Sequence, residues 1–213
     1  MKKLIIIGAG GYAKSVLDSI NFYEYKVCGF IDDYKNEKEH LGYPILGKSI
    51  DWIEKPDIFF YFVAIGNNEK RTDWYNQLKS RNLKVINVID RSAIVSQYAK
   101  IGEGCFIGKM AIVNSKVEIG NNCIINTKAL VEHGCHIGNN INISTNTVLN
   151  GDVVVGNMSF VGSCSVINGQ ITIGKNVMVG SGTVIIRDVE DNATVVGVPA
   201  KVIKLGGKRV WSV

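Results

Sequence analysis

The second half of the chain has a six-residue period that neither an α-helix nor an ordinary β-strand produces. From residue 101, every sixth residue is aliphatic, fifteen times in succession: Ile101, Ile107, Val113, Ile119, Ile125, Val131, Ile137, Ile143, Leu149, Val155, Val161, Ile167, Ile173, Val179 and Ile185. Helices repeat about every 3.6 residues and strands every 2 residues, so neither fits. A six-residue repeat predicts a parallel β-helix, in which each unit supplies one short strand and one turn and three units close a triangular coil.

Two further columns accompany the aliphatic one. Gly or Asn often follows the aliphatic residue directly, and we expect it to tolerate an unusual backbone at the corner of the coil. A small or β-branched residue often stands four positions after the aliphatic one, as Cys105, Cys123 and Cys135 do. These cysteines are therefore predicted to pack inward rather than to act as reactive thiols. The period breaks at Asp191, which predicts a β-helix over residues 89–190 and a C-terminal extension over 191–213.

Residues 1–88 have a different organisation, with apolar strands alternating with amphipathic helices. An apolar run at 3–7 is followed by a glycine-rich turn and then by apolar residues at helical spacing up to Ile20. The stretches YKVCGFID, GYPILG, FFYFVAIG and KVINVI predict further strands, KNEKEH a polar loop, and residues 69–80 a second helix. This order predicts a small parallel α/β domain of Rossmann-like type.

The glycine-rich turn of this domain has the spacing of a dinucleotide-binding motif. Gly8, Gly10 and Ala13 follow a strand and open a helix, and Asp32 stands at the end of the next strand. Because 88 residues supply only one half of a dinucleotide fold, we expect one nucleotide instead. Backbone N–H groups at the turn would bind a phosphate or carboxylate, while Asp32 or Asp33 would accept hydrogen bonds from sugar hydroxyls. The AIGNN stretch at 64–68 ends at the same edge of the predicted sheet.

Composition excludes several classes of protein. The formal charge is +5, yet no Lys/Arg block exceeds two residues, which does not favour nucleic-acid binding. The apolar run at 4–7 is too short to cross a membrane and resembles no signal peptide, so a cytoplasmic protein without membrane insertion is predicted. The odd number of cysteines, five, without a CxxC pair favours reduced thiols.

Two of the three histidines lie in LVEHGCHIGNN at 130–140. His133 stands two residues after Val131, at a predicted corner, where side chains project outward. It is either an exposed turn residue or a general base, since imidazole titrates near neutral pH. His136 is less informative. His40 lies in the other half of the chain, so no set of histidine metal ligands is predicted.

In order and across nearly the whole chain, these stretches resemble the NeuD/PglD family of sugar acetyltransferases. The resemblance lies in MKKLIIIGAGGYAKSVLDSI, GFIDD, AIGNN, the repeats with VEHGCHIGNN, and GVPAKVI. It implies a left-handed β-helix, a homotrimer, and acetyl-CoA as co-substrate between subunits. The residues from 142 to 163 look most like NeuD, which O-acetylates sialic acid, rather than PglD-type enzymes, which N-acetylate UDP-linked amino sugars.

The resemblance also implies roles for individual residues. His133 matches the catalytic base, and Gly151 matches the residue whose backbone N–H faces the developing oxyanion. Asn142, Gly151, Ser163 and Ser181 match cofactor-binding positions. The positions that match the sugar or nucleotide pocket are Gly8, Gly10, Gly11, Tyr12, Asp32, Asp33 and Gly66. Two residues depart from the PglD pattern: Gly134 stands in place of an acidic residue, and Asn142 in place of a second histidine.

We therefore expect an acetyl-CoA-dependent O-acetyltransferase that acts on sialic acid or CMP-sialic acid in bacterial capsule or other surface polysaccharide biosynthesis, by direct transfer. One alternative is an N-acetyltransferase of a nucleotide-linked amino sugar. Another is a non-catalytic trimeric scaffold for sialic acid biosynthesis enzymes. Trp211 is a candidate for covering the adenine end of the cofactor or a neighbouring subunit.

Overall fold

The computed structural model describes residues 1–209, so Trp211 lies outside the described residues. The chain divides into two compact units, Met1–Arg91 and the residues from Ser92 onward. Among the described residues, no helix combines the length and the apolar character needed to cross a membrane.

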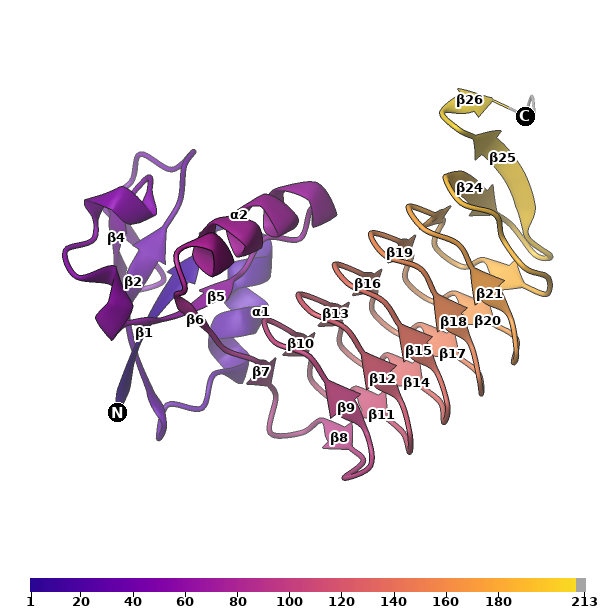
Figure 1. Cartoon of the computed structure of the whole chain (residues 1–213), viewed down its shortest axis with the longest axis horizontal. Helices are drawn as coiled ribbons and strands as arrows, with labels where there is room; N and C mark the ends of the chain where they lie inside the picture. The colour runs from indigo at the N-terminus through magenta and orange to yellow at the C-terminus, as the bar shows by residue number, and fades with distance from the viewer. Residues whose placement is uncertain (210–213) are drawn as a thin grey trace. The chain divides into compact units, whose positions relative to one another are not determined.

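The first unit is an α/β domain built on a sheet of order β3-β4-β2-β1-β5-β6 (Figure 1). All neighbouring strands are parallel except β3 and β4. The strands are β1 (Lys2–Ile7), β2 (Tyr25–Ile31), β3 (Glu39–His40), β4 (Tyr43–Gly47), β5 (Phe60–Val63) and β6 (Lys84–Val85); the helices are α1 (Gly11–Ser19) and α2 (Asn68–Ser80), with short 3₁₀ turns η1 (Ile50–Trp52) and η2 (Pro56–Ile58). The predicted α/β domain is thus confirmed. Strand β3 lies in a segment predicted as loop, because a two-residue edge strand carries no detectable periodicity.

The turn between β1 and α1 lies at the edge of the sheet where the parallel strands end, and it packs closely against its neighbours there. Gly8 has a φ of +95°, and a Cβ added there would lie 2.7 Å from the Ile65 side chain and 2.9 Å from the Ala64 carbonyl oxygen. Only glycine satisfies both the backbone conformation and the close approach. The turn is therefore pressed directly against the residues that follow β5.

The second unit is a parallel β-helix with three faces, and Figure 1 shows its successive coils. The first face holds β10 (Phe106–Ile107), β13 (Ile124–Ile125), β16 (Asn142–Ile143), β19 (Phe160–Val161) and β22 (Met178–Val179), in the same sheet as β7 (Val88–Ile89). The second face holds β8 (Ile94–Val95), β11 (Ile112–Val113), β14 (Leu130–Val131), β17 (Val148–Leu149), β20 (Val166–Ile167) and β23 (Val184–Ile185). The third face holds β9 (Lys100–Ile101), β12 (Glu118–Ile119), β15 (His136–Ile137), β18 (Val154–Val155) and β21 (Thr172–Ile173). The predicted hexapeptide β-helix is confirmed.

Two inward columns form the core of the β-helix. From Ile107 to Ile185, every in-phase aliphatic residue is at most 4% exposed. The small residues four positions later are also buried, and their polar members, except Thr183, donate hydrogen bonds to the carbonyl oxygen fifteen residues ahead. The donors are Cys105, Cys123, Cys135, Thr147, Ser159 and Ser165, at 2.8–3.1 Å. This column therefore links each coil to the next.

The expectation that Gly or Asn after the aliphatic residue adopts the unusual backbone is wrong. The positive φ falls three residues after the aliphatic one, for example at Met110 (+56°) and Lys128 (+57°). The glycines directly after the aliphatic residue serve close approach between coils instead. A Cβ at Gly120 would lie 2.7 Å from the carbonyl oxygen of Gly138 in the next coil. These corner positions hold Gly, Asn or Asp in most coils, but residues such as Met110 and Lys128 adopt the same left-handed backbone.

The residues expected to form the extension begin as part of the first face. Strand β24 (Ala193–Val196) pairs in parallel with β22, and its Ala193 and Val195 are buried in the β-helix core. The chain then turns back through β25 (Lys201–Leu205) and β26 (Lys208–Arg209), which pair antiparallel.

Candidate functional site

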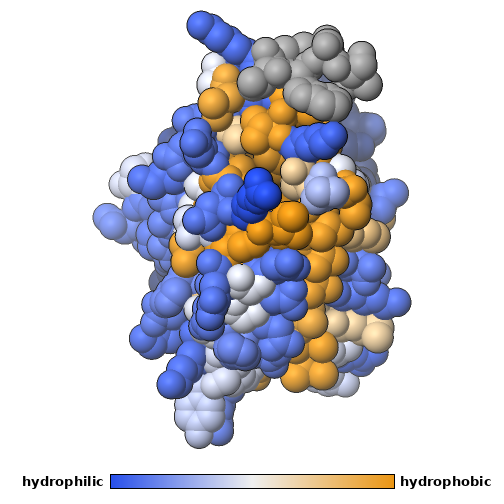
Figure 2. Space-filling view, turned by 90° about the vertical axis from the view of Figure 1, so that its right-hand side faces the viewer, coloured by the Kyte–Doolittle hydropathy of each residue, from blue (hydrophilic) through white to orange (hydrophobic). Residues whose placement is uncertain are grey.

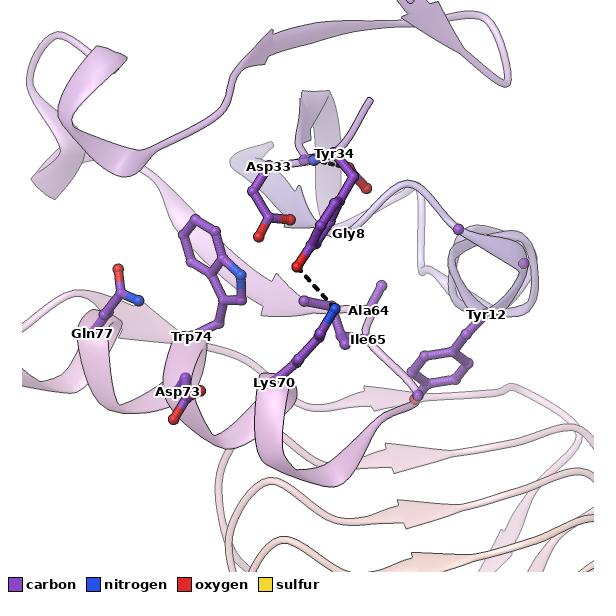
Figure 3. A pocket seen from close by; sticks show the side chains of 14 residues that line it. Gly8, Tyr12, Asp33, Tyr34, Ala64, Ile65, Lys70, Asp73, Trp74 and Gln77 are labelled. Carbon is purple, nitrogen blue, oxygen red and sulfur yellow. Dashed lines mark hydrogen bonds between the residues drawn. The ribbon is translucent and has the colours of Figure 1, made fainter. Parts of the chain in front are cut away.

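A cavity of about 500 Å³ opens at the carboxyl edge of the first unit's sheet (Figure 3). Its walls come from the turn after β1, the end of β2, the loop after β5 and one side of α2. All seven residues expected in a sugar or nucleotide pocket line this cavity: Gly8, Gly10, Gly11, Tyr12, Asp32, Asp33 and Gly66. Ligands of open parallel sheets bind at this edge.

The two aspartates at the end of β2 have different surroundings. One carboxylate oxygen of Asp32 accepts from the Ala9 N–H at 2.7 Å, and the other accepts from the N–H groups of Tyr34 and Lys35 at 3.0 and 2.9 Å. Asp32 is 9% exposed and holds the glycine turn to the loop after β2. The Asp33 side chain lines the pocket and does not tie two loops together as Asp32 does (Figure 3). Asp33 is therefore the better placed of the two to accept from a ligand.

The loop after β5 is held by a buried arginine. Arg71, on α2, is 1% exposed. Its guanidinium donates to the carbonyl oxygens of Ile65 and Gly66 at 3.3 and 3.2 Å and to Asn68 Oδ1 at 2.8 Å. Sequence reasoning missed this residue, since a basic residue in a polar helix looks exposed. Its contacts fix the pocket wall that contains Gly66.

Helix α2 also places Lys70 and Trp74 in the pocket. Lys70 Nζ donates to Tyr34 Oη at 2.9 Å and lies 4.3 Å from the centre of the Tyr34 ring (Figure 3). This hydrogen bond raises the pKa of Lys70 above its usual value. No sequence signal identified Tyr34, Lys70 or Trp74 as pocket residues, because they lie outside the glycine motif.

In the second unit, His133 lies at the corner between β14 and β15, with its side chain exposed. Its imidazole packs on Gly151 in the next coil: a Cβ added at Gly151 would lie 2.6 Å from His133 Cε1 and 2.8 Å from Nε2. The Gly151 N–H makes no hydrogen bond among the described residues, whereas its carbonyl accepts from Gln170 at 2.9 Å. An imidazole and an open N–H donor therefore lie side by side on one corner.

Gly134, where an acidic residue would match the PglD pattern, has a φ of +69°. A Cβ at this position would collide with Oδ1 of Asp152 in the next coil. The neighbouring Glu132 carboxylate accepts from Asn114 Nδ2 at 2.9 Å and from the His133 N–H at 3.4 Å. The space beside residue 134 is thus already occupied by a carboxylate from the next coil.

Apart from Gly151, the residues expected to bind the cofactor lie on other parts of the β-helix. Asn142 is 7% exposed and lies on the first face, in β16. Ser163 lies between β19 and β20, and Ser181 between β22 and β23, at the corner that joins the first face to the second. His133 and Gly151 lie at the corner that joins the second face to the third. Within one chain, the structure does not bring the two sets together.

His136 has a different setting from His133. It points outward on the third face, where its Nδ1 lies 3.4 Å from Glu118, which in turn pairs with Lys100 at 2.8 Å. Lys100, followed by the more distant His136, lowers the pKa of Glu118. Among the described residues, no cluster of three or more His, Cys, Asp or Glu side chains is arranged to hold a metal ion.

An α/β domain with a nucleotide-sized pocket, followed by a hexapeptide β-helix, defines a class of bacterial transferases, and family comparisons agree with it. Residues 3–78 match the PglD N-terminal domain, and residues 98–133 match the bacterial transferase hexapeptide repeat. Both parts of the fold are thus matched independently.

Relatives of known structure extend over nearly the whole chain. The acetyltransferase domain of PglB from Neisseria gonorrhoeae, in complex with acetyl coenzyme A, is 31% identical with a TM-score of 0.89, covering 94% of this chain and 98% of that one. A mutant of perosamine N-acetyltransferase from Caulobacter crescentus, in complex with CoA and GDP-perosamine, is 32% identical with a TM-score of 0.89, covering 93% of this chain and 95% of that one. The chain therefore belongs to the PglD/NeuD-type family of sugar acetyltransferases.

A curated relative from Bacillus subtilis, UDP-N-acetylbacillosamine N-acetyltransferase, is 35% identical over 115 residues. That match covers 50% of this chain, and the chain spans about half the length, 51%, of this relative. This relative and the Caulobacter crescentus protein are named as N-acetyltransferases of amino sugars, and none of the three relatives is named as a NeuD-type enzyme.

Proposed function

We propose that the chain is an acetyl-CoA-dependent N-acetyltransferase of a nucleotide-linked amino sugar, with His133 as general base. The observation that carries the proposal is the perosamine N-acetyltransferase complex, which holds CoA and GDP-perosamine in a protein that aligns with 93% of this chain. The pocket in the first unit supplies a site for the nucleotide, and the His133 corner supplies the chemistry.

This choice replaces the expectation of sialic acid O-acetylation. That expectation relied on the resemblance of the sequence at residues 142–163 to NeuD. The named relatives act on bacillosamine and perosamine, both amino sugars, and none supports sialic acid or capsule biosynthesis. The N-acetyltransferase alternative is therefore the better supported of the two.

The chemistry is direct acyl transfer. The neutral amine of the sugar attacks the thioester carbonyl of acetyl-CoA, a C–N bond forms, and the C–S bond breaks to release the CoA thiol. His133 accepts the proton that the amine loses and passes it to the departing thiolate, so that CoA leaves as the thiol and the imidazole returns to its neutral form. The open Gly151 N–H is placed to stabilise the negative charge that develops on the carbonyl oxygen.

We further propose a homotrimer with the site between subunits. The outward residues of the second face form an unbroken aliphatic column: Ile94, Ile112, Leu130, Val148, Val166 and Val184. Ile94 is 63% exposed, and the others are half-buried. Such a column favours association with another copy. Figure 2 shows apolar residues gathered in a band on the side that carries the C-terminal end of the β-helix.

The second face separates the two sets of site residues. The His133 corner lies on one edge of this face, and the Ser163 and Ser181 corner lies on the other. If second faces pack around a three-fold axis, the His133 corner of one copy meets the Ser163 corner of its neighbour. A trimer of this kind would therefore bring together the His133 corner and the Ser163 corner, which lie apart in a single chain.

The test offers acetyl-CoA with UDP-linked 4-amino sugars, GDP-perosamine, sialic acid or CMP-sialic acid, and follows thiol release and product mass. We expect turnover with an amino sugar nucleotide and loss of that turnover in His133→Ala. His136→Ala is the matched control, since it changes the same residue type on the third face. Turnover with the sialic acids alone, or an active His133→Ala variant, would refute the proposal, and inactivity toward every acceptor would favour the scaffold alternative.

A further inference from the structure

The charges that line the pocket in the first unit are unevenly distributed. Three carboxylates, on Asp32, Asp33 and Asp73, line the described cavity together with one basic side chain, Lys70. The charge of Asp32 is already compensated by its three backbone N–H donors. A nucleoside diphosphate brings several negative charges into this space, and Lys70 is the basic side chain there to meet them.

Lys70 is held by a weak partner. Its ammonium group has three protons to donate, and in the described part of the chain its one hydrogen bond goes to the neutral hydroxyl of Tyr34 at 2.9 Å. No carboxylate lies within ion-pair distance of it among these residues. An ammonium group with a neutral acceptor and free donors is available to a stronger, anionic acceptor.

The pair also spans the pocket. Tyr34 follows the end of β2, is 68% exposed, and approaches the cavity from one side, whereas Lys70 rises from the first turn of α2 on the other (Figure 3). Asn67 caps this helix by accepting from the Lys70 N–H at 3.0 Å, which fixes the backbone position of Lys70. Only the flexible side chain has to move for Lys70 to reach a ligand.

We propose that Lys70 binds the diphosphate of the nucleotide-linked substrate, and that Tyr34 holds the Lys70 ammonium group until the diphosphate replaces it. This inference rests on the proposed function, because that function supplies the nucleotide. The exchange is favourable because a phosphate oxygen carries a charge opposite to that of the ammonium group, whereas the Tyr34 hydroxyl oxygen is neutral. Tyr34 is then released from Lys70 when the ligand is bound.

The experiment measures the dissociation constants of UDP, GDP, uridine and guanosine by calorimetry. Lys70→Met removes the charge but keeps length and helix propensity. We expect it to weaken binding of the diphosphate that the wild type binds by about tenfold or more, and to leave the matching nucleoside unchanged. Lys70→Arg keeps the charge and should retain most of the affinity. Lys79→Met is the matched control, because Lys79 is exposed on the same helix and does not line the pocket.

Tyr34→Phe removes the acceptor hydroxyl while keeping the ring. In this variant Lys70 has no hydrogen bond to residue 34 that must break before it binds the diphosphate. The affinity for the diphosphate should therefore be unchanged or higher. A loss in Tyr34→Phe as large as that in Lys70→Met would overturn the exchange between the two partners. Equal losses for the diphosphate and its nucleoside in Lys70→Met would show a role in pocket shape alone and would also overturn it.

The two proposals fail in different ways. Unchanged diphosphate affinity in Lys70→Met, with acetyl transfer to an amino sugar nucleotide intact, would overturn the role of Lys70 and leave the proposed function standing. A wild-type protein that binds neither UDP nor GDP would overturn the role of Lys70, and absence of transfer to any nucleotide-linked acceptor would overturn the proposed function.

Discussion

Replacing Gly151 by alanine tests whether the contact between the His133 ring and the next coil positions the base. The added Cβ would lie 2.6 Å from Cε1, 2.8 Å from Nε2 and 3.3 Å from Nδ1 of His133. Carbon atoms in contact are about 3.5–4.0 Å apart, so the ring has to move by about 1 Å. His133 is exposed and is free to move outward without unfolding its corner.

This displacement has a large effect on rate and a small one on stability. A misplacement of about 1 Å in a catalytic group lowers the rate by about 100-fold, or about 2.7 kcal/mol of transition-state stabilisation. Gly151 does not have a positive φ, so alanine suits its backbone. The free energy of unfolding should therefore change by less than about 1 kcal/mol.

The assay compares kcat from CoA thiol release with the thermal midpoint of the same samples. Gly169→Ala is the control, since it lies at the same corner one coil further on and its added Cβ would lie within 3.9 Å of no His133 atom, its nearest neighbour being the Gly151 carbonyl oxygen at 3.1 Å. We expect this variant to retain most of its activity. A Gly151→Ala variant with wild-type kcat would show that the position of the His133 ring does not matter for transfer, and the assigned base would be refuted.

Two further predictions concern stability. Ser165→Ala removes the buried hydroxyl that donates to the Gly180 carbonyl oxygen at 3.0 Å, and should lower the free energy of unfolding by about 1–3 kcal/mol in urea titrations. Burial, followed by the positive charges of Lys35 and Lys14, lowers the pKa of His40. Because the unfolded chain takes up this proton near pH 6.5 and the folded chain only at lower pH, stability should fall as the pH drops below about 6.5, and His40→Phe should reduce this dependence.

Each of these two stability predictions has a matched control or an outcome that would contradict it. Ser165→Cys should retain most of the stability, since Cys135 occupies an equivalent inward position and its Sγ lies 3.1 Å from the Asn150 carbonyl oxygen. A Ser165→Ala variant as stable as the wild type would contradict the role of the inter-coil hydrogen bond. Phenylalanine at position 40 can keep the edge-on contact with Phe30, 5.2 Å between ring centres. Urea midpoints that fall equally with pH in wild type and His40→Phe would contradict the assignment to His40.

The fold was predictable because its main signal is a periodic pattern that can be read directly along the sequence. A six-residue aliphatic period has one known structural solution, and Gly8 between a strand and a helix requires a tight turn. The backbone of the corners was not predictable in the same way. Residues such as Met110 and Lys128 carry positive φ because the coil geometry imposes it, and nothing in their side chains indicates this.

The candidate site was predictable only in part. The glycine motif and the paired aspartates located the pocket, but their chemistry depends on hydrogen bonds that form in three dimensions. Asp32 and Asp33 are identical in sequence terms, yet Asp32 alone is occupied by three backbone donors. Lys70 and Arg71 are adjacent basic residues on one helix, and only the fold decides that Arg71 is buried while Lys70 reaches the pocket.

The register of the coils restricts how the length of this protein can change. Strand partners lie 18 residues apart from β8 to β23, as in the pairing of Ile119 with Ile137, whereas the last coil is shorter and pairs Met178 with Thr194, 16 residues on. An insertion of one full coil would leave every inward column aligned, whereas an insertion of any number that is not a multiple of six would turn aliphatic side chains to solvent. Length variation among homologues should therefore come in whole coils, or else be confined to loops that leave the prism at its corners.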